Sequence, residues 1–121
     1  MTISTIDHVN IATQDLAKTR EFFVDALGFE DGPRPAFGTP GHWLYVGGHP
    51  IVHLQLAKGP VSPSRSSALN HIAFRVADLD MIAARLSARG IPYQMFQLPG
   101  TTSRQLQIED PNGALIELRS Q

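Results

Sequence analysis

An internal repeat constrains this sequence more than any other feature. The segment I-D-H-V-N-I-A-T-Q-D-L, residues 6–16, aligns with L-N-H-I-A-F-R-V-A-D-L, residues 69–79. The alignment brings His8 onto His71, 63 positions further along the chain. Self-similarity at a fixed spacing indicates one supersecondary unit that is used twice.

The ends of the two copies agree as well. The segment G-G-H-P-I-V-H-L, residues 47–54, resembles D-P-N-G-A-L-I-E-L, residues 110–118, and this aligns His53 with Glu117, 64 positions apart. The drift of one position relative to the start of the repeat corresponds to a single insertion. A stretch rich in Pro and Ser, Gly59–Ser67, separates the copies and has the composition of a linker.

The hydrophobic period changes in the same order in each copy. Alternating apolar and polar residues predict a first strand, at 8–11 and again at 71–76. Helical spacing follows, with Thr13 or Asp15, and Asp78, as N-caps and Gly28 and Gly90 at the helix ends. Short alternating runs then complete each copy, W-L-Y-V and I-V-H-L-Q-L in the first and R-Q-L-Q-I and A-L-I-E-L in the second. We therefore predict an α+β fold, a single domain over residues 1–121 built from two tandem βαβββ modules, 1–58 and 68–121.

Composition narrows the classes of function. The net charge of −1 at pH 7 provides no basic surface for nucleic acid, and the apolar runs are too short to span a membrane. The sequence contains no cysteine, so a bound metal must be held by His, Asp or Glu. We expect a soluble, cytoplasmic protein that acts on a small molecule, with no nucleic-acid or membrane partner.

Strand parity separates an apolar face from a polar one in each module, because neighbouring strand residues point to opposite faces. The apolar set should pack against the helices and comprises Val9, Ile11, Val52, Leu54, Ile72, Phe74, Ile116 and Leu118. Four side chains able to bind metal, each expected in the middle of a strand, share the opposite face: His8, His53, His71 and Glu117. Imidazole and carboxylate donors together suit one divalent ion of Zn, Ni, Co, Mn or Fe.

A structural interpretation of these four residues is the alternative. A single strand histidine is more often a hydrogen-bonded, partly buried residue than a ligand, and Arg75 and Arg119 share the parity of His71 and Glu117. These arginines could neutralise the carboxylate. Three imidazoles and a carboxylate on one small face would be costly without a metal or such partners, and the joint pattern favours the metal.

Three segments carry a resemblance to a known family. The opening D-H-V-N-I-A-T, the central N-H-I-A-F-R-V and the closing D-P-N-G-A-L-I-E-L resemble the vicinal oxygen chelate superfamily of glyoxalases, bleomycin-resistance proteins and extradiol dioxygenases. The resemblance covers nearly the whole chain. It implies that the modules curl into open U-shaped mixed sheets around a divalent metal. His8 and His71 would be the first-strand ligands, and His53 and Glu117 the last-strand ligands.

The resemblance also implies an activity, in which the metal acts as a Lewis acid on a small substrate chelated through neighbouring oxygens. Isomerase or lyase chemistry of the glyoxalase kind ranks first, with Glu117 as catalytic base and His53 in place of one glutamate of glyoxalase I. A ring-cleaving extradiol dioxygenase ranks second, because His8, His71 and Glu117 match its Fe(II) triad. An antibiotic-resistance protein, either a thiol transferase or a drug-binding protein, ranks third.

Four further residues are candidates for binding substrate: Asn10, Trp43, Tyr45 and Arg104. Trp43 and Tyr45 share one strand parity and could form an aromatic wall, although simple packing explains them equally well. The irregular stretch Asp31–Gly41 is a candidate lid. We expect His42 and His49 to be surface residues beside turns.

Each module carries only two ligands, and a half-site of that kind holds a divalent ion poorly. A second module must complete it, either within the chain or from a second chain. The resemblance favours a homodimer with two shared sites. Each site would then draw His8 and His53 from one chain and His71 and Glu117 from the other.

Overall fold

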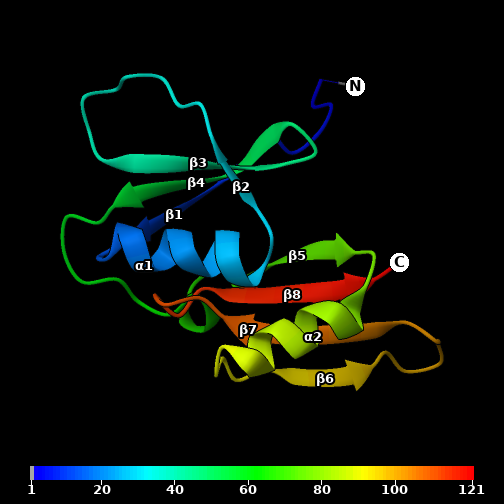
Figure 1. The fold of residues 1–121 in the computed structure, drawn as a ribbon. Coiled ribbons are helices and arrows are strands. Elements are labelled where there is room, and N and C mark those ends of the chain that lie inside the picture. The colour runs from blue at the N-terminus through cyan, green and yellow to red at the C-terminus, as the bar shows by residue number, and fades with distance from the viewer. Residues whose placement is uncertain (1) are drawn as a thin grey trace. The chain divides into compact units, whose positions relative to one another are not determined.

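The chain folds as two units with the same order of elements, as the repeat predicts (Figure 1). The structure is a computed structural model and describes residues 2–121. The first unit extends to Val61 and the second begins at Ser62. Within the described residues, no helix is long and apolar enough to span a membrane.

The first unit contains four strands, which form one mixed sheet in the order β1-β4-β3-β2. Its elements are β1 (Val9–Thr13), α1 (Leu16–Glu21), the π-helix η1 (Phe22–Ala26), β2 (Glu30–Gly32), β3 (Gly41–Val46) and β4 (His49–Leu56). β1 runs parallel to β4, and the other two pairings are antiparallel.

The second unit repeats this arrangement in the order β5-β8-β7-β6, again with one parallel pair. Its elements are η2 (Ser64–Ser66), β5 (His71–Val76), α2 (Leu79–Ala88), β6 (Gln94–Gln97), β7 (Arg104–Glu109) and β8 (Leu115–Ser120). The βαβββ order and the mixed sheets agree with the predicted fold class.

Aspartate caps begin both helices. The carboxylate of Asp15 accepts the backbone N–H of Lys18, and that of Asp78 accepts the backbone N–H of Met81, each at 3.0 Å. The predicted helix ending at Gly28 is not α-helical throughout, because its last turn, η1, is a π-helix. Gly28 follows with a φ of 85°, a value that favours glycine.

Each core lies between the helix and one face of the sheet. Figure 1 shows α1 against the first sheet and α2 against the second. The fully buried side chains come from alternating strand positions and from the helices, and include Phe23, Leu44, Val52, Leu54, Leu86, Leu106, Ile116 and Leu118. The opposite face of each sheet is therefore left for polar residues.

The predicted linker does not stay outside the units. Its second half forms η2, where the backbone N–H of Ser64 donates to the carbonyl of Gly113 at 3.0 Å. The Ser64 hydroxyl in turn accepts the backbone N–H of Leu115 at 2.7 Å. These bonds join η2 to the D-P-N-G turn before β8, so the second unit begins at Ser62 and not at residue 68.

Candidate metal centre

Register places the candidate last-strand ligands at the middle of each sheet. His53 on β4 lies between Asn10 on β1 and Trp43 on β3. Glu117 on β8 lies between Ala73 on β5 and Gln107 on β7. These two sets of three neighbouring residues occupy equivalent positions in the repeat, and both lie on the sheet face opposite the core.

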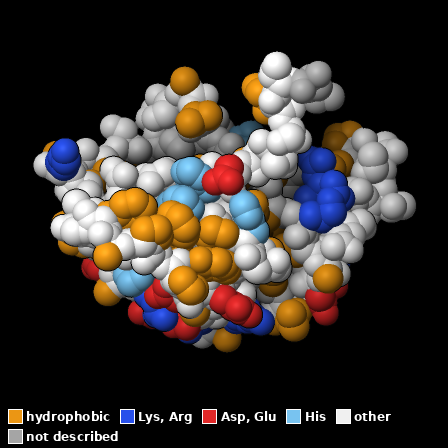
Figure 2. All heavy atoms as spheres, turned by 90° about the horizontal axis from the view of Figure 1, so that it is seen from above, with side chains coloured by type: hydrophobic (Ala, Val, Ile, Leu, Met, Phe, Trp, Pro, Cys, Tyr) orange, Lys and Arg blue, Asp and Glu red, His pale blue; other side chains and the backbone are white. Residues whose placement is uncertain are grey.

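In the first unit, three aromatic rings form a stack. The rings of His8 and His53 have centroids 3.8 Å apart and an interplanar angle of 8°, and Trp43 covers the other face of His53 at 4.2 Å and 14°. On the face drawn in Figure 2, histidine side chains lie beside an acidic side chain and among hydrophobic ones. The first unit thus brings both of its predicted ligands together.

Hydrogen bonds select one nitrogen of each of these imidazoles. Nδ1 of His8 lies 2.7 Å from the Asp7 carboxylate, and Nε2 of His53 lies 3.0 Å from the Pro50 carbonyl oxygen. Because both partners accept hydrogen bonds, a neutral His8 keeps Nε2 unprotonated and a neutral His53 keeps Nδ1 unprotonated. An unprotonated ring nitrogen is the form that binds a metal.

Burial also favours the neutral form of His53, which is only 9% exposed. Desolvation lowers the pKa of His53, and the neighbouring His8 lowers it further. His53 is therefore neutral at pH 7. Its near-parallel stack on His8 also means that one of the two rings must turn before both can bind the same ion.

In the second unit, His71 and Glu117 face each other. His71 Nε2 lies 3.4 Å from Glu117 Oε1, while Gln107 donates from its side-chain amide to Glu117 Oε2 at 2.8 Å. Glu117 is buried and His71 is exposed. The amide of Gln107 therefore holds one carboxylate oxygen and leaves the other toward the histidine.

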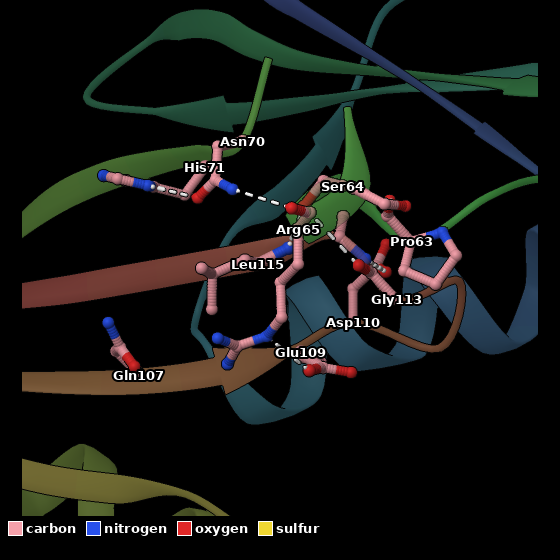
Figure 3. Close-up of polar contacts among 12 residues, drawn as sticks. Pro63, Ser64, Arg65, Asn70, His71, Gln107, Glu109, Asp110, Gly113 and Leu115 are labelled. Atoms are coloured by element: carbon pink, nitrogen blue, oxygen red, sulfur yellow. Dashed lines mark hydrogen bonds and ion pairs between the residues drawn. The ribbon is translucent and has the colours of Figure 1, made fainter. Parts of the chain in front are cut away.

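The orientation of His71 is set by Asn70. The Asn70 amide donates from Nδ2 to the Arg65 carbonyl at 3.1 Å, and its Oδ1 lies 2.9 Å from His71 Nδ1 (Figure 3). Because Oδ1 only accepts, His71 Nδ1 carries a proton. A neutral His71 then faces Glu117 with the lone pair of Nε2.

The arginines of the structural alternative bond elsewhere. Arg119 donates to the Gln105 side chain at 3.0 Å, and Arg75 donates to the Ser120 carbonyl at 3.2 Å. The groups in contact with the Glu117 carboxylate are His71 and Gln107. Charge neutralisation by these two arginines therefore does not explain the carboxylate.

The first-strand ligands lie nearer the strand ends than we predicted. β1 begins at Val9, so His8 precedes it, and His71 is the first residue of β5. The β1–β4 ladder starts at Val9 and Val52, beside a bulge in the β3–β4 pairing. Both histidines are therefore exposed, whereas His53 and Glu117 are buried.

Three of the predicted substrate-binding residues lie on the polar face of the first sheet. Asn10 and Trp43 flank His53, and the Tyr45 ring lies over Gly32 with its hydroxyl donating to the Pro33 carbonyl. The fourth lies elsewhere. Arg104 shares the core-facing parity of Leu106 and pairs with Asp80 on α2 at 2.8 Å, so it is not brought to the Glu117 face.

The loop between β2 and β3 packs against the aromatic wall. Phe37 lies 6.2 Å from Trp43 between ring centroids, and the Arg34 guanidinium lies 4.9 Å from the Phe37 centroid. His49 is exposed as predicted, and His42 is partly buried with Nδ1 3.1 Å from the Asp31 carboxylate. The loop therefore lies against Trp43, the ring at one end of the stack.

Gln107, Asp7 and Asn70 are not among the site residues predicted from the sequence. The repeat carried a signal for each, because Gln107 is 64 positions after Trp43, and Asn70 is 63 positions after Asp7. A pocket of about 410 Å³ in the second unit is lined by residues that include Gln107, Tyr93 and Gln94. Gln107, which bonds Glu117, is thus also a lining residue of this pocket.

The donor set fits a divalent metal. Within residues 2–121, no group of three or more candidate ligand side chains lies close enough to hold an ion. Each unit supplies one pair, and the nitrogen and carboxylate donors suit Zn, Ni, Co, Mn or Fe(II). Convergence of the two pairs on one ion stays a prediction.

A duplicated βαβββ unit with these mixed sheets is the glyoxalase-like fold. In sequence, residues 5–118 match the family model of the Glyoxalase/Bleomycin resistance protein/Dioxygenase superfamily. The chain belongs to this superfamily. It is 29% identical to the uncharacterized protein YaeR of Escherichia coli (strain K12), with 98% of each chain covered.

Solved structures agree with this assignment. A putative glyoxalase family protein from Bacillus anthracis has a TM-score of 0.83 at 25% identity, covering 99% of this chain and 97% of that one. The fold is also that of the fosfomycin resistance protein FosX from Listeria monocytogenes, with a TM-score of 0.79, 20% identity and coverage of 99% and 95%. The lactoylglutathione lyase from Agrobacterium tumefaciens has a TM-score of 0.73, 19% identity and coverage of 99% and 96%.

Proposed function

We propose that the chain is a divalent-metal-dependent isomerase or lyase of the glyoxalase kind. His8, His53, His71 and Glu117 are the metal ligands, and Glu117 is also the base that accepts a proton from a carbon next to a carbonyl. The bound metal supplies Lewis-acid stabilisation of the charge that develops on a substrate oxygen. The substrate is a small molecule with two neighbouring oxygens.

The contact between His71 and Glu117 carries this proposal. A neutral His71 turns the lone pair of Nε2 toward Glu117 Oε1 at 3.4 Å, which places two acceptors face to face. Such a pair needs a cation or an extra proton between its members. An ion bonded to each atom at about 2.1 Å accommodates any separation up to about 4 Å.

The chain's own residues divide the remaining work. Gln107 holds Glu117 Oε2 and so limits rotation of the carboxylate. Trp43 and Tyr45 offer an aromatic wall in the first unit, and the pocket beside Gln107 offers space in the second. A small polar substrate would be oriented between such surfaces and the ligand atoms.

The first test is metal binding. Metal-free protein is titrated with Zn, Ni, Co, Mn and Fe(II), and binding is followed by calorimetry and by the fluorescence of Trp43, the single tryptophan. We expect about one ion per chain and a fluorescence change that His53→Ala removes, because His53 stacks on Trp43. Protein that binds none of these ions rejects the proposal.

The second test is catalysis. Exchange of deuterium from solvent into α-hydroxycarbonyl and α-oxocarbonyl compounds is followed by NMR with the metal-loaded protein. Glu117→Gln should lower the rate by about a hundred-fold to ten-thousand-fold, the usual contribution of a positioned base. The exposed Asp25→Asn variant removes a carboxylate from another surface and serves as control. Near-full activity of Glu117→Gln would reject the role of this residue.

An extradiol-type dioxygenase is the second candidate, and the stack in the first unit favours it. If His53 stays between His8 and Trp43, the remaining ligands are His8, His71 and Glu117, a two-histidine, one-carboxylate set that suits Fe(II). Oxygen uptake by Fe(II)-loaded protein with a panel of catechols distinguishes this activity. The antibiotic-resistance alternative is tested with fosfomycin and a thiol, and by drug binding without metal.

We also propose a homodimer in which each site combines His8 and His53 of one chain with His71 and Glu117 of the other. Support comes from the division of the ligands, since each unit holds one pair. Two donors seldom hold a divalent ion firmly, and sites of this kind use three or four.

A further inference from the structure

The residue before each first-strand histidine makes the same contact in both units. Asp7 Oδ2 lies 2.7 Å from His8 Nδ1, and Asn70 Oδ1 lies 2.9 Å from His71 Nδ1. Asp7 and Asn70 are 63 positions apart, as are the two histidines. The duplicated unit has therefore kept an acceptor at this position while its chemical type has changed.

We propose that Asp7 and Asn70 are positioning residues that fix the ring tautomer of His8 and His71, so that Nε2 of each is the nitrogen offered to a divalent cation. This inference rests on the proposed metal centre. The side-chain oxygen of each residue accepts the Nδ1 proton, and a neutral imidazole has only one ring proton. Nε2 is left as the donor atom.

The acceptor in the second unit is itself held in place. A carbonyl oxygen cannot donate, so the Asn70 atom facing the Arg65 carbonyl at 3.1 Å must be the amide nitrogen. The amide oxygen is then the atom that faces His71, as Figure 3 shows. Arg65 in turn follows Ser64, which is bonded to the D-P-N-G turn, so a chain of contacts fixes the Asn70 amide.

The acceptor in the first unit differs in charge. Asp7 offers a carboxylate, which makes a stronger, charge-assisted hydrogen bond than a neutral amide does. Its backbone carbonyl separately accepts from His49 Nε2 at 2.6 Å. A change of the Asp7 side chain therefore leaves the contact with His49 in place.

The experiment measures the tautomers directly in the full-length, metal-free protein. Two-bond ¹H–¹⁵N correlation spectra at a pH where the imidazoles are neutral should show Nε2 unprotonated in both His8 and His71. Asp7→Ala should return His8 to the tautomer mixture of unconstrained imidazole, and Asn70→Ala should do the same for His71. Asp7→Asn and Asn70→Asp keep an acceptor and should preserve the tautomer.

Metal affinity is the second readout. Loss of the group that accepts a hydrogen bond from a metal-ligating histidine weakens metal binding by about ten-fold to a hundred-fold. Asp7→Ala should therefore raise the Kd for Zn²⁺ in that range. Asn70→Ala should raise the Kd less, because the Asn70 amide that it removes is neutral whereas the Asp7 carboxylate is charged. The matched control is Asp25→Ala, which removes one exposed negative charge from the same unit.

The outcomes separate this inference from the proposed function. If wild-type protein binds no ion, both the metal centre and the positioning role toward a metal are rejected. The tautomer spectra still decide whether Asp7 and Asn70 fix the tautomers of His8 and His71. If wild-type protein binds Zn²⁺ but the alanine variants keep the wild-type tautomers or the wild-type affinity, the positioning role is overturned and the metal centre stands.

Discussion

His53 shows how one residue can be prepared for ligation by its surroundings. Two rings cover its faces, the Pro50 carbonyl accepts from Nε2, and burial lowers its pKa. Burial favours the neutral ring, while the bond to Pro50 offsets part of this effect, keeps the ring proton on Nε2 and leaves Nδ1 of the neutral ring unprotonated. The cost is that protonating His53 opposes folding.

This cost gives a prediction on the metal-free protein. Histidine in an unfolded chain has a pKa of about 6.5, and in the folded state the pKa of His53 is lowered. As pH falls below about 6.5, the unfolded chain binds a proton at this position first, so the free energy of unfolding decreases. Urea denaturation should show a steeper loss between about pH 7 and pH 5 in wild type than in His53→Gln. Equal slopes would contradict the lowered pKa.

At the scale of elements, the D-P-N-G turn before β8 has a structural role. The buried Asp110 carboxylate accepts the backbone N–H groups of Asn112 and Ala114, both at 2.8 Å, and the Asn112 amide at 3.0 Å. Burial raises the pKa of Asp110, and these hydrogen bonds offset part of that effect. Gly113 completes the turn with a φ of 84°.

Asp110→Ala should therefore destabilise the protein strongly. Two part-buried backbone N–H groups would lose their acceptor, and each loss costs about 1 to 3 kcal/mol, so the free energy of unfolding should fall by about 2 to 6 kcal/mol. Urea denaturation measures the change. The neighbouring Glu109→Ala removes a half-exposed ion pair with Arg65, worth at most about 1 kcal/mol. An equal effect of the two variants would show that the turn is not stabilised in this way.

The repeat allowed much of the fold and the candidate site to be predicted. Equivalent strands, capped helices and strand parity follow from local periodicity, and parity alone put His53 and Glu117 on the polar faces. The η2 helix could not be predicted, because the bonds from Ser64 to Gly113 and Leu115 join residues about 50 positions apart in sequence. The roles of Gln107 and Asn70 depend on side-chain orientations, which hydrophobic periodicity does not encode.

At the scale of the whole molecule, the division of ligands between the units predicts a dimer. Sedimentation at micromolar concentration should give a dimer that binds two ions. A monomer that nevertheless binds one ion per chain would overturn the shared site and favour closure within the chain.

Mixing two variants tests more sharply whether each site is shared between two chains. Homodimers of His8→Ala and of Glu117→Gln each carry two damaged sites. If sites are shared as proposed, the mixed dimer combines one doubly damaged site with one intact site, so mixing should restore about half of the wild-type activity per mixed dimer. Sites built within one chain would gain nothing from mixing.

The central claim is that His8, His53, His71 and Glu117 bind one divalent ion. Its most direct test is a crystal structure of metal-loaded protein with anomalous difference maps on either side of the ion's absorption edge. We expect one anomalous peak per site, at about 2.0 to 2.3 Å from a ring nitrogen of each histidine and from a Glu117 oxygen. A peak bound by other residues, or His8 and Glu117 side chains directed away from any common ion, would contradict it.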